Sequence, residues 1–346
     1  MKGNARPKGL GAVRRRRVGG DAATLVAGER LLADSPIPWC LRPAVDGVDL
    51  AEWAEANRAA LEALLLEHRA LLFRGFGVRD VAAFERFIAA SSDGVKLEYR
   101  DRTTPRETRG TNVYTSTVHP PEERINLHNE GTYWVRWAAK LYFSVLRTPD
   151  SGGQTPIADV RAVLGRIPAE VRARFEAHGM MLVRNFNLGF GLPWQDVFQT
   201  SDRAEVEAYC NANDIRFEWG AGDHLRTSQV RPAVRRHPVT GEAVWFNHAA
   251  FFHNTSLEAG MRAALLGEYG EEGLPYDTRY GDGAPIEPEV AEVLRAAYLA
   301  ERVVFPWEAG DVMLLDNMTV AHAREPFVGE REVVVAMTDA VDPALA

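Results

Sequence analysis

The amino-acid sequence predicts a mainly β fold with flanking helices, arranged as a jelly roll. Short apolar runs bounded by turn residues are typical of buried strands, and the clearest of them are residues 71–76, 141–146, 312–317 and 331–337. Two histidines with metal-binding chemistry, His128 and His322, lie far apart in the chain, and His322 follows a β-rich run. A jelly roll can unite such positions, because a late strand returns beside an early one.

The composition is that of an ordinary globular protein, and it narrows the classes of function. The chain has 346 residues, 46% of them hydrophobic and 25% charged, which is enough for a sizeable core. No apolar run reaches the roughly 18 residues of a membrane span, and the N-terminus lacks the pattern of a secretory signal, so we expect a cytoplasmic protein with no membrane partner. Cys40 and Cys210 are too few for a disulfide scaffold or a cysteine-based zinc site, and we expect packed thiols.

Residues 1–20 differ from the rest of the chain in charge. They contain seven Lys and Arg residues and no acid, so the formal net charge of −8 becomes −15 for the remainder. The basic segment has no aromatic residue, and the acidic remainder argues against nucleic acid as a partner. We therefore expect a disordered, solvated leader over residues 1–20 and a single domain over residues 21–346.

The elements of the first half follow from periodicity. Residues 49–70 place apolar side chains at helical spacing on one face, with Asp49 as a suitable N-cap, so we expect one long amphipathic helix. A second helix is predicted over residues 81–90. Residues 103–121 lose this periodicity and are rich in Thr, Arg and Pro, which is typical of a long surface loop that serves as a lid or binding element.

The second half alternates short helices, short strands and turns. Glycine pairs and Gly-rich aromatic stretches indicate turns or loops at residues 151–160, 185–194 and 277–286. Periodicity predicts helices over residues 161–177, 202–213, 256–269 and 287–302, and strands over residues 216–219, 225–230 and 243–247.

The stretch INLHNEGTYW, residues 125–134, contains the first candidate site. In an extended strand, His128 and Glu130 point to the same face, so an imidazole and a carboxylate converge. A second histidine completes the 2-His-1-carboxylate triad that leaves open positions on Fe(II). An H-x-E triplet also arises by chance with a structural histidine, but His322 supplies the missing ligand in the right order.

Six stretches together carry a resemblance to a known family. The sequence resembles the Fe(II)/2-oxoglutarate dioxygenases of the taurine-dioxygenase family, within the branch of syringomycin-type and clavaminate-synthase-like enzymes. This resemblance implies a double-stranded β-helix. The stretches are NVYTST (112–117), INLHNE (125–130), GGQTP (152–156), WFNHAAFFH (245–253), YGDG (280–283) and GDVMLLDNMTVAH (310–322).

The resemblance also implies the roles of particular residues. His128, Glu130 and His322 would bind iron, and Thr155 with an arginine would hold the distal carboxylate of 2-oxoglutarate. The planar guanidinium fork suits a carboxylate. We expect Arg331, nine residues after His322, to be that arginine. Arg324 is the alternative, because the spacing between this histidine and the arginine is often somewhat longer than nine residues in the family. An error of one residue on a strand would turn the side chain to the other face.

The activity that the resemblance implies is hydroxylation of an unactivated C–H bond, coupled to O₂ consumption and to conversion of 2-oxoglutarate into succinate and CO₂. The small-molecule substrate would be an amino acid, free or tethered to a carrier protein, or a peptide-like natural-product intermediate. Related halogenases lack the carboxylate ligand, so Glu130 argues against halogenation. Desaturation, ring closure, a non-catalytic jelly-roll binding protein and zinc hydrolysis stay open as alternatives.

His248 and His253 belong to the stretch WFNHAAFFH, and two interpretations stay open for them. Such histidines are most often packing or loop residues, but this stretch can also place one of them beside the substrate.

Overall fold

A seven-stranded sheet confirms the expectation that late strands return beside early ones. The computed structural model describes residues 25–92, 94, 101, 113–115, 119–189 and 191–341. Strand β15, from near the end of the chain, lies between β3 and β6, and all pairs in the sheet are antiparallel except β2–β3. In spatial order the strands are β1 (Val26–Leu32), β2 (Ser35–Pro43), β3 (Ala70–Phe73), β15 (Val312–Asp316), β6 (Trp137–Arg147), β18 (Glu332–Val341) and β4 (Val113–Thr115).

A smaller sheet carries the two histidines of interest. Its order is β5 (Ile125–His128), β16 (Val320–Arg324) and β8 (Ile157–Asp159). Side chains of this sheet share one core with one face of the large sheet; this core includes Leu141 and Phe143 of β6 and Val333 and Val335 of β18. Strand periodicity places alternate residues of the large sheet in this core and the residues between them on its other face.

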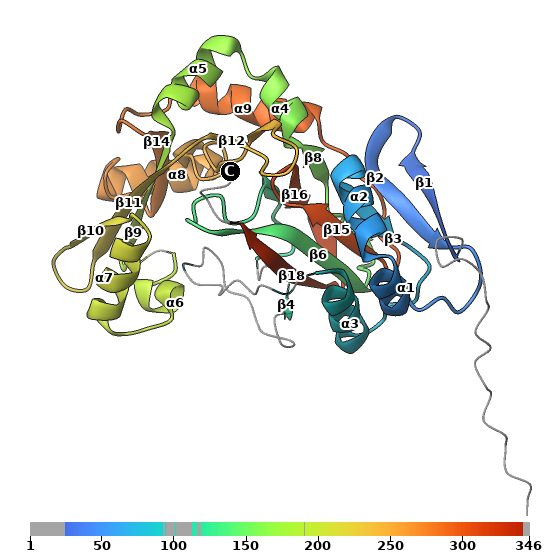
Figure 1. Ribbon diagram of the computed structural model, residues 1–346. Coiled ribbons are helices and arrows are strands. Elements are labelled where there is room, and N and C mark those ends of the chain that lie inside the picture. The colour runs from blue at the N-terminus through green and yellow to red at the C-terminus, as the bar shows by residue number, and fades with distance from the viewer. Residues whose placement is uncertain are drawn as a thin grey trace, which may run out of the picture.

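Three helices cover the other face of the large sheet, where Tyr142 and Leu314 are buried. They are α1 (Leu50–Ala56), α2 (Arg58–His68) and α3 (Val81–Ser91), which lie together beside β3 and β15 in Figure 1. The prediction of a single helix over residues 49–70 is wrong. Asn57 has the non-helical angles φ −124° and ψ 24°, and its side-chain amide donates to the carbonyl of Trp53, which offers the backbone an alternative to the helix. Asp49 is the N-cap as expected.

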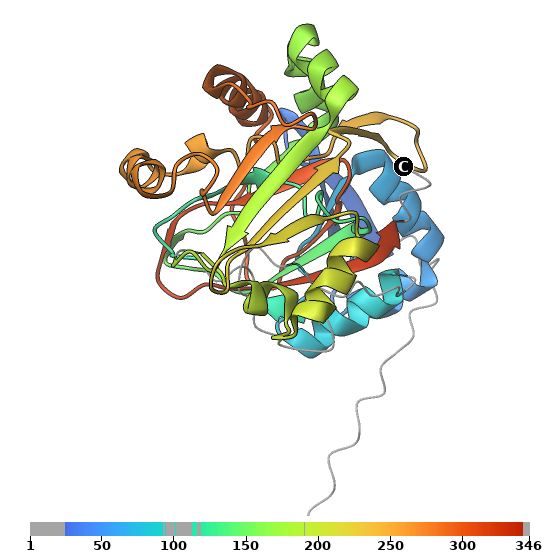
Figure 2. The same ribbon diagram turned by 90° about the vertical axis from the view of Figure 1, so that its left-hand side faces the viewer.

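Of a separate four-stranded sheet, the sequence predicted only two strands, β10 and β11. Its order is β10 (Arg216–Trp219), β11 (Leu225–Arg231), β9 (Met180–Phe186) and β14 (Tyr276–Tyr280), and it is nearest the viewer in Figure 2. Strands β9 and β14 extend into the segments 185–194 and 277–286, for which we expected only loops and turns. The glycine-rich segments beside these strands indicate turns in the sequence. In the structure the strands are stabilised by long-range pairing of β9 with both β11 and β14. Helices α6 (Trp194–Phe198) and α7 (Arg203–Ala212) pack nearby.

The remaining elements complete the shell around the smaller sheet. Pro168 divides the helix expected over residues 161–177 into α4 (Val160–Arg166) and α5 (Ala169–His178).

No helix among the described residues is long and apolar enough to cross a membrane. The expected leader and most of the loop at residues 103–121 lie outside the described residues. The other elements are β7 (Ser151–Gly152), β12 (Val234–Arg236), β13 (Ala243–Trp245), η2 (Asn254–Ser256), α8 (Ala259–Tyr269), α9 (Pro288–Ala300) and β17 (Phe327–Val328).

Candidate active site

His128, Glu130 and His322 converge at one point on the smaller sheet. His322 pairs with His128 in the antiparallel register of β16 and β5, and their ring centroids are 4.4 Å apart. Nε2 of His322 lies 4.0 Å from Oε2 of Glu130, and one ligand atom from each of the three residues lies within 4.8 Å of the others. These are the only three described residues of ligand type that form such a group.

The route by which Glu130 reaches this point differs from the expectation. Strand β5 ends at His128, so the two residues do not share one extended strand; Glu130 lies in the turn that follows. The turn is buried, with Glu130 only 6% exposed. Glu130 nevertheless converges with the histidines, because the tight turn brings its carboxylate back towards His322.

A hydrogen bond to the main chain sets the tautomer of His128. Its Nδ1 lies 2.8 Å from the carbonyl oxygen of Asn126, which can only accept, so Nδ1 carries the proton. The lone pair of a neutral imidazole then belongs to Nε2. Phe143 packs against the His322 ring, with centroids 5.1 Å apart, and provides an apolar wall.

A pocket that is partly open to solvent adjoins the two histidines, and its lining includes both Thr155 and Arg331. Arg331 donates from Nε to the carbonyl of Gly153 at 2.9 Å and from Nη2 to the hydroxyl of Thr155 at 3.5 Å. Trp307 donates from Nε1 to the same hydroxyl at 3.1 Å. Because Thr155 accepts two hydrogen bonds there, its own O–H proton is directed to a further acceptor.

The electrostatics of this pocket favour an anion. Burial lowers the pKa of Arg331 to about 10, and the positive charge of Arg324 adds to this effect. An anionic group bound beside Arg331 would stabilise the charged guanidinium. The pocket is therefore suited to a carboxylate.

The alternative arginine, Arg324, lines the same pocket but has a different set of contacts. Its guanidinium donates to the carbonyl oxygens of His119, Pro120 and Glu123 at 2.9, 2.5 and 2.7 Å. These bonds attach the segment 119–123 to β16. Of the two arginines, only Arg331 hydrogen-bonds Thr155 among the described residues.

The histidines of the WFNHAAFFH stretch occupy different environments. His248 lies beside the triad, with its ring centroid 5.8 Å from that of His128, and it stacks on Phe252 at 5.0 Å. Burial lowers the pKa of His248 well below its usual value, so the ring is neutral, and its Nδ1 contacts the hydroxyl of Thr132. His253 instead donates from Nε2 to the carbonyl of Ile286 at 3.0 Å, which makes it a structural histidine.

The donor set fits Fe(II). Two imidazoles and one carboxylate are the ligands of the facial triad, and three protein ligands leave coordination positions open for other molecules. The neighbouring Thr155 and Arg331 provide hydrogen-bond donors suited to the carboxylate of a ketoacid.

Comparison with known proteins identifies the family. The model of the family described as "Taurine catabolism dioxygenase TauD, TfdA family" matches residues 34–337. The chain is 42% identical to the dapdiamide synthesis protein DdaC of Enterobacter agglomerans over 284 residues, which cover 82% of this chain and 86% of that protein. It is 29% identical to a clavaminate synthase-like protein of Arabidopsis thaliana, over 80% of this chain and 83% of that protein.

The comparison with solved structures concerns the fold. A taurine dioxygenase from Burkholderia xenovorans superposes with a TM-score of 0.55 at 18% identity, covering 93% of each chain. This likeness confirms the jelly-roll fold. Because the family model matches most of the sequence, the chain belongs to the TauD/TfdA family, and it is a dioxygenase that depends on Fe(II) and 2-oxoglutarate.

Proposed function

We propose that the enzyme hydroxylates an unactivated C–H bond of an amino acid or of a peptide-like natural-product intermediate. The observation that carries the proposal is the convergence of His128, Glu130 and His322 beside a pocket that contains Thr155 and Arg331. In this proposal the first three residues bind iron, and the last two hold the distal carboxylate of 2-oxoglutarate.

The residues of the pocket have separate tasks in this reaction. When bound, iron supplies the activation of O₂ that is coupled to conversion of 2-oxoglutarate into succinate and CO₂. The guanidinium fork of Arg331 orients 2-oxoglutarate through its distal carboxylate, and Thr155 donates its hydroxyl proton to the same group. The side chains of Phe143, Val333 and Val335 line the pocket and exclude water from it.

The choice of substrate rests on the relative with 42% identity. That protein is named for dapdiamide synthesis, which favours a natural-product intermediate as the substrate of this chain. A substrate tethered to a carrier protein is the second form to be tested. Because Glu130 occupies the carboxylate position, halogenation is not part of the proposal. Desaturation or ring closure of the same substrate would be a different outcome of the same experiment.

The test starts with the metal-free protein under anaerobic conditions. Fe(II) and then 2-oxoglutarate are added, and we expect the weak visible charge-transfer band of a chelated ketoacid in wild type and none in His128→Ala. Absence of the band in wild type would contradict the proposed roles of these residues.

The second stage identifies the reaction. After O₂ is admitted, succinate release is measured with a panel of free amino acids, peptides and carrier-bound aminoacyl groups. A substrate that stimulates succinate release and gains the mass of one oxygen atom supports hydroxylation. A product that has lost two hydrogen atoms would contradict hydroxylation and would assign desaturation or ring closure to the enzyme.

A further inference from the structure

The turn between β15 and β16 carries a fully buried asparagine that contacts the main chain of Glu130. The side-chain Nδ2 of Asn317 donates to the carbonyl of Glu130 at 2.9 Å and to the carbonyl of Ala138 at 2.8 Å. Its Oδ1 accepts the N–H of Glu130 at 2.8 Å. The orientation of the amide is fixed, because a rotation by 180° would place Nδ2 against an N–H and Oδ1 against two carbonyls.

The main chain of Asn317 is held from the same side. Its carbonyl accepts the side-chain amide of Asn129 at 2.6 Å, and its N–H donates to the carbonyl of Ala139 at 2.8 Å. Two consecutive residues of the H-x-E turn, Asn129 and Glu130, therefore hydrogen-bond Asn317. Strand β16, which begins three residues after Asn317, carries His322.

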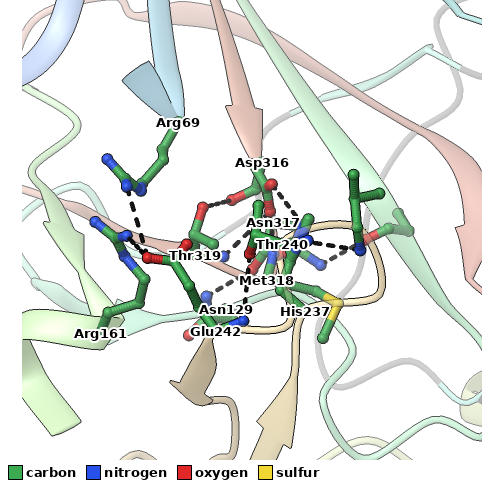
Figure 3. Close-up of polar contacts among 12 residues, drawn as sticks. Arg69, Asn129, Arg161, His237, Thr240, Glu242, Asp316, Asn317, Met318 and Thr319 are labelled. Atoms are coloured by element: carbon green, nitrogen blue, oxygen red, sulfur yellow. Dashed lines mark hydrogen bonds and ion pairs between the residues drawn. The ribbon is translucent and has the colours of Figure 1, made fainter. Parts of the chain in front are cut away.

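The other side of the same turn is anchored by Asp316. Its Oδ1 accepts the N–H groups of Met318 at 2.9 Å and Thr319 at 3.2 Å, and its Oδ2 lies 2.9 Å from Nε2 of His237. Figure 3 draws these residues together. His237 accepts the N–H of Thr240 at Nδ1, so its proton is on Nε2 and is donated to Asp316. Asp316 and His237 thus restrict the turn that presents Asn317.

This arrangement matters because Glu130 lies beyond the end of β5 and outside the hydrogen-bond ladder of the sheet. Asn317 supplies a partner for both its N–H and its C=O, as a neighbouring strand would. A metal ligand must be held to within about 0.5 Å for tight binding, and the groups around it provide that restraint.

We propose that Asn317 is a positioning residue that sets the carboxylate of Glu130 for iron binding through the main chain of that residue. The inference rests on the proposed role of Glu130 as an iron ligand. It adds a residue that does not touch the metal and that the sequence did not single out. Its one signal in the sequence is a polar Asp-Asn pair directly after the apolar residues 312–315.

Metal affinity tests the inference without turnover. Metal-free wild type and Asn317→Ala are titrated anaerobically with Fe(II), and with Co(II) as a spectroscopic probe of the ligand field. We expect Asn317→Ala to bind both metals about 10- to 100-fold more weakly, the range found when a residue that orients a metal ligand is replaced.

Asn185 offers a matched control. It is buried, and its Nδ2 also donates to two carbonyls, those of Glu272 at 2.9 Å and Leu274 at 2.7 Å, but it lies on β9. We expect Asn185→Ala to lower the melting temperature of the metal-free protein, as Asn317→Ala does, and to bind Fe(II) and Co(II) as wild type does. A purely structural role of Asn317 would make the two variants alike in both measurements.

Asn317→Asp is the second variant and carries the test if Asn317→Ala does not fold. Aspartate has the same shape and keeps the acceptor for the N–H of Glu130, but it loses the two donors. We expect weaker binding and an altered Co(II) absorption spectrum. Wild-type affinity in the folded variants would overturn the inference alone, whereas a wild type that binds neither metal would overturn it together with the proposed role of Glu130.

Discussion

His322 on β16 lies directly opposite His128 on β5, with 4.4 Å between the centroids of their rings. Cross-strand neighbours have Cβ atoms about 5 Å apart, so the register of two strands sets the spacing of the two imidazoles before any metal binds. Backbone pairing alone therefore brings together two of the three proposed iron ligands from distant parts of the chain. Glu130 adds the third ligand from the turn after β5.

Removal of a proposed ligand should abolish activity without unfolding the protein. We expect Glu130→Ala and His322→Ala to reduce succinate formation by at least about 100-fold, because replacing a residue behind the ligands already costs about 10- to 100-fold in affinity or activity. Melting of the metal-free variants checks that they fold, and the anaerobic charge-transfer band reports the site directly. Full activity of either variant would refute its assignment as a ligand.

The sequence predicted much of the fold for reasons that are local. Apolar runs such as residues 312–317 form buried strands because both of their faces are covered, and Asp49 begins α1 because its carboxylate caps the free N–H groups. The prediction of a single helix over residues 49–70 was wrong. The segments 185–194 and 277–286, expected to be loops or turns, contain the end of β9 and most of β14. Those outcomes depend on the hydrogen bond from the side chain of Asn57 to the carbonyl of Trp53 and on pairing between distant strands.

The sequence names candidate site residues, but it does not indicate which other residues hold them in place. The order of H-x-E, Thr155, His322 and Arg331 names side chains that lie close together. His128, Thr155, His322 and Arg331 line one pocket, and Glu130 converges with the two histidines. Their roles in binding iron and 2-oxoglutarate stay a prediction. The contacts of Asn317 with Glu130 and of Trp307 with Thr155 join residues far apart in the chain. Such contacts leave no spacing pattern in a single sequence.

Replacing Arg331 should weaken the binding of 2-oxoglutarate, whereas replacing Arg324 should lower the stability of the protein. Arg331→Ala is expected to raise the 2-oxoglutarate concentration for half-maximal succinate formation about 100-fold, since a hydrogen bond to a charged group contributes up to about 3 kcal/mol. Arg324→Ala is expected to change that concentration little and to lose about 2 kcal/mol of unfolding free energy, because it releases the carbonyls of His119, Pro120 and Glu123. The reverse pattern would assign the carboxylate to Arg324.

Gly153 should be sensitive to a single added methyl group. Its φ is +70°, and a Cβ there would lie 2.8 Å from Cγ of Pro149 and 3.0 Å from Cδ of Arg331. Gly153→Ala is therefore expected to displace Arg331 and raise the 2-oxoglutarate requirement about 10-fold, the effect of losing about 1.4 kcal/mol, while Fe(II) affinity stays at the wild-type value. Gly165→Ala is the control, because a Cβ at Gly165 meets no atom within 4 Å. An unchanged 2-oxoglutarate requirement in Gly153→Ala would contradict the role of Arg331.

His253 should make the stability of the metal-free protein depend on pH. Burial lowers its pKa below the usual value of 6.5, more than Asp277 and the hydrogen bond to Ile286 raise it, and Arg295 and Arg262 lower it further. Between the folded and unfolded pKa values the unfolded chain binds more protons, so the contribution is complete above pH 6.5 and is lost as the pH falls through the folded pKa. At pH 7.5 we therefore expect the unfolding free energy of His253→Gln to be about 1 kcal/mol lower than that of wild type. When the pH is lowered from 7.5 to 5.5, the unfolding free energy of His253→Gln should fall by less than that of wild type. Melting of both proteins after treatment with a chelator measures this difference. The charge-transfer band of His253→Gln should be unchanged, because His253 does not line the pocket beside the triad. If the stability of the variant depends on pH as fully as that of wild type, His253 does not titrate on unfolding.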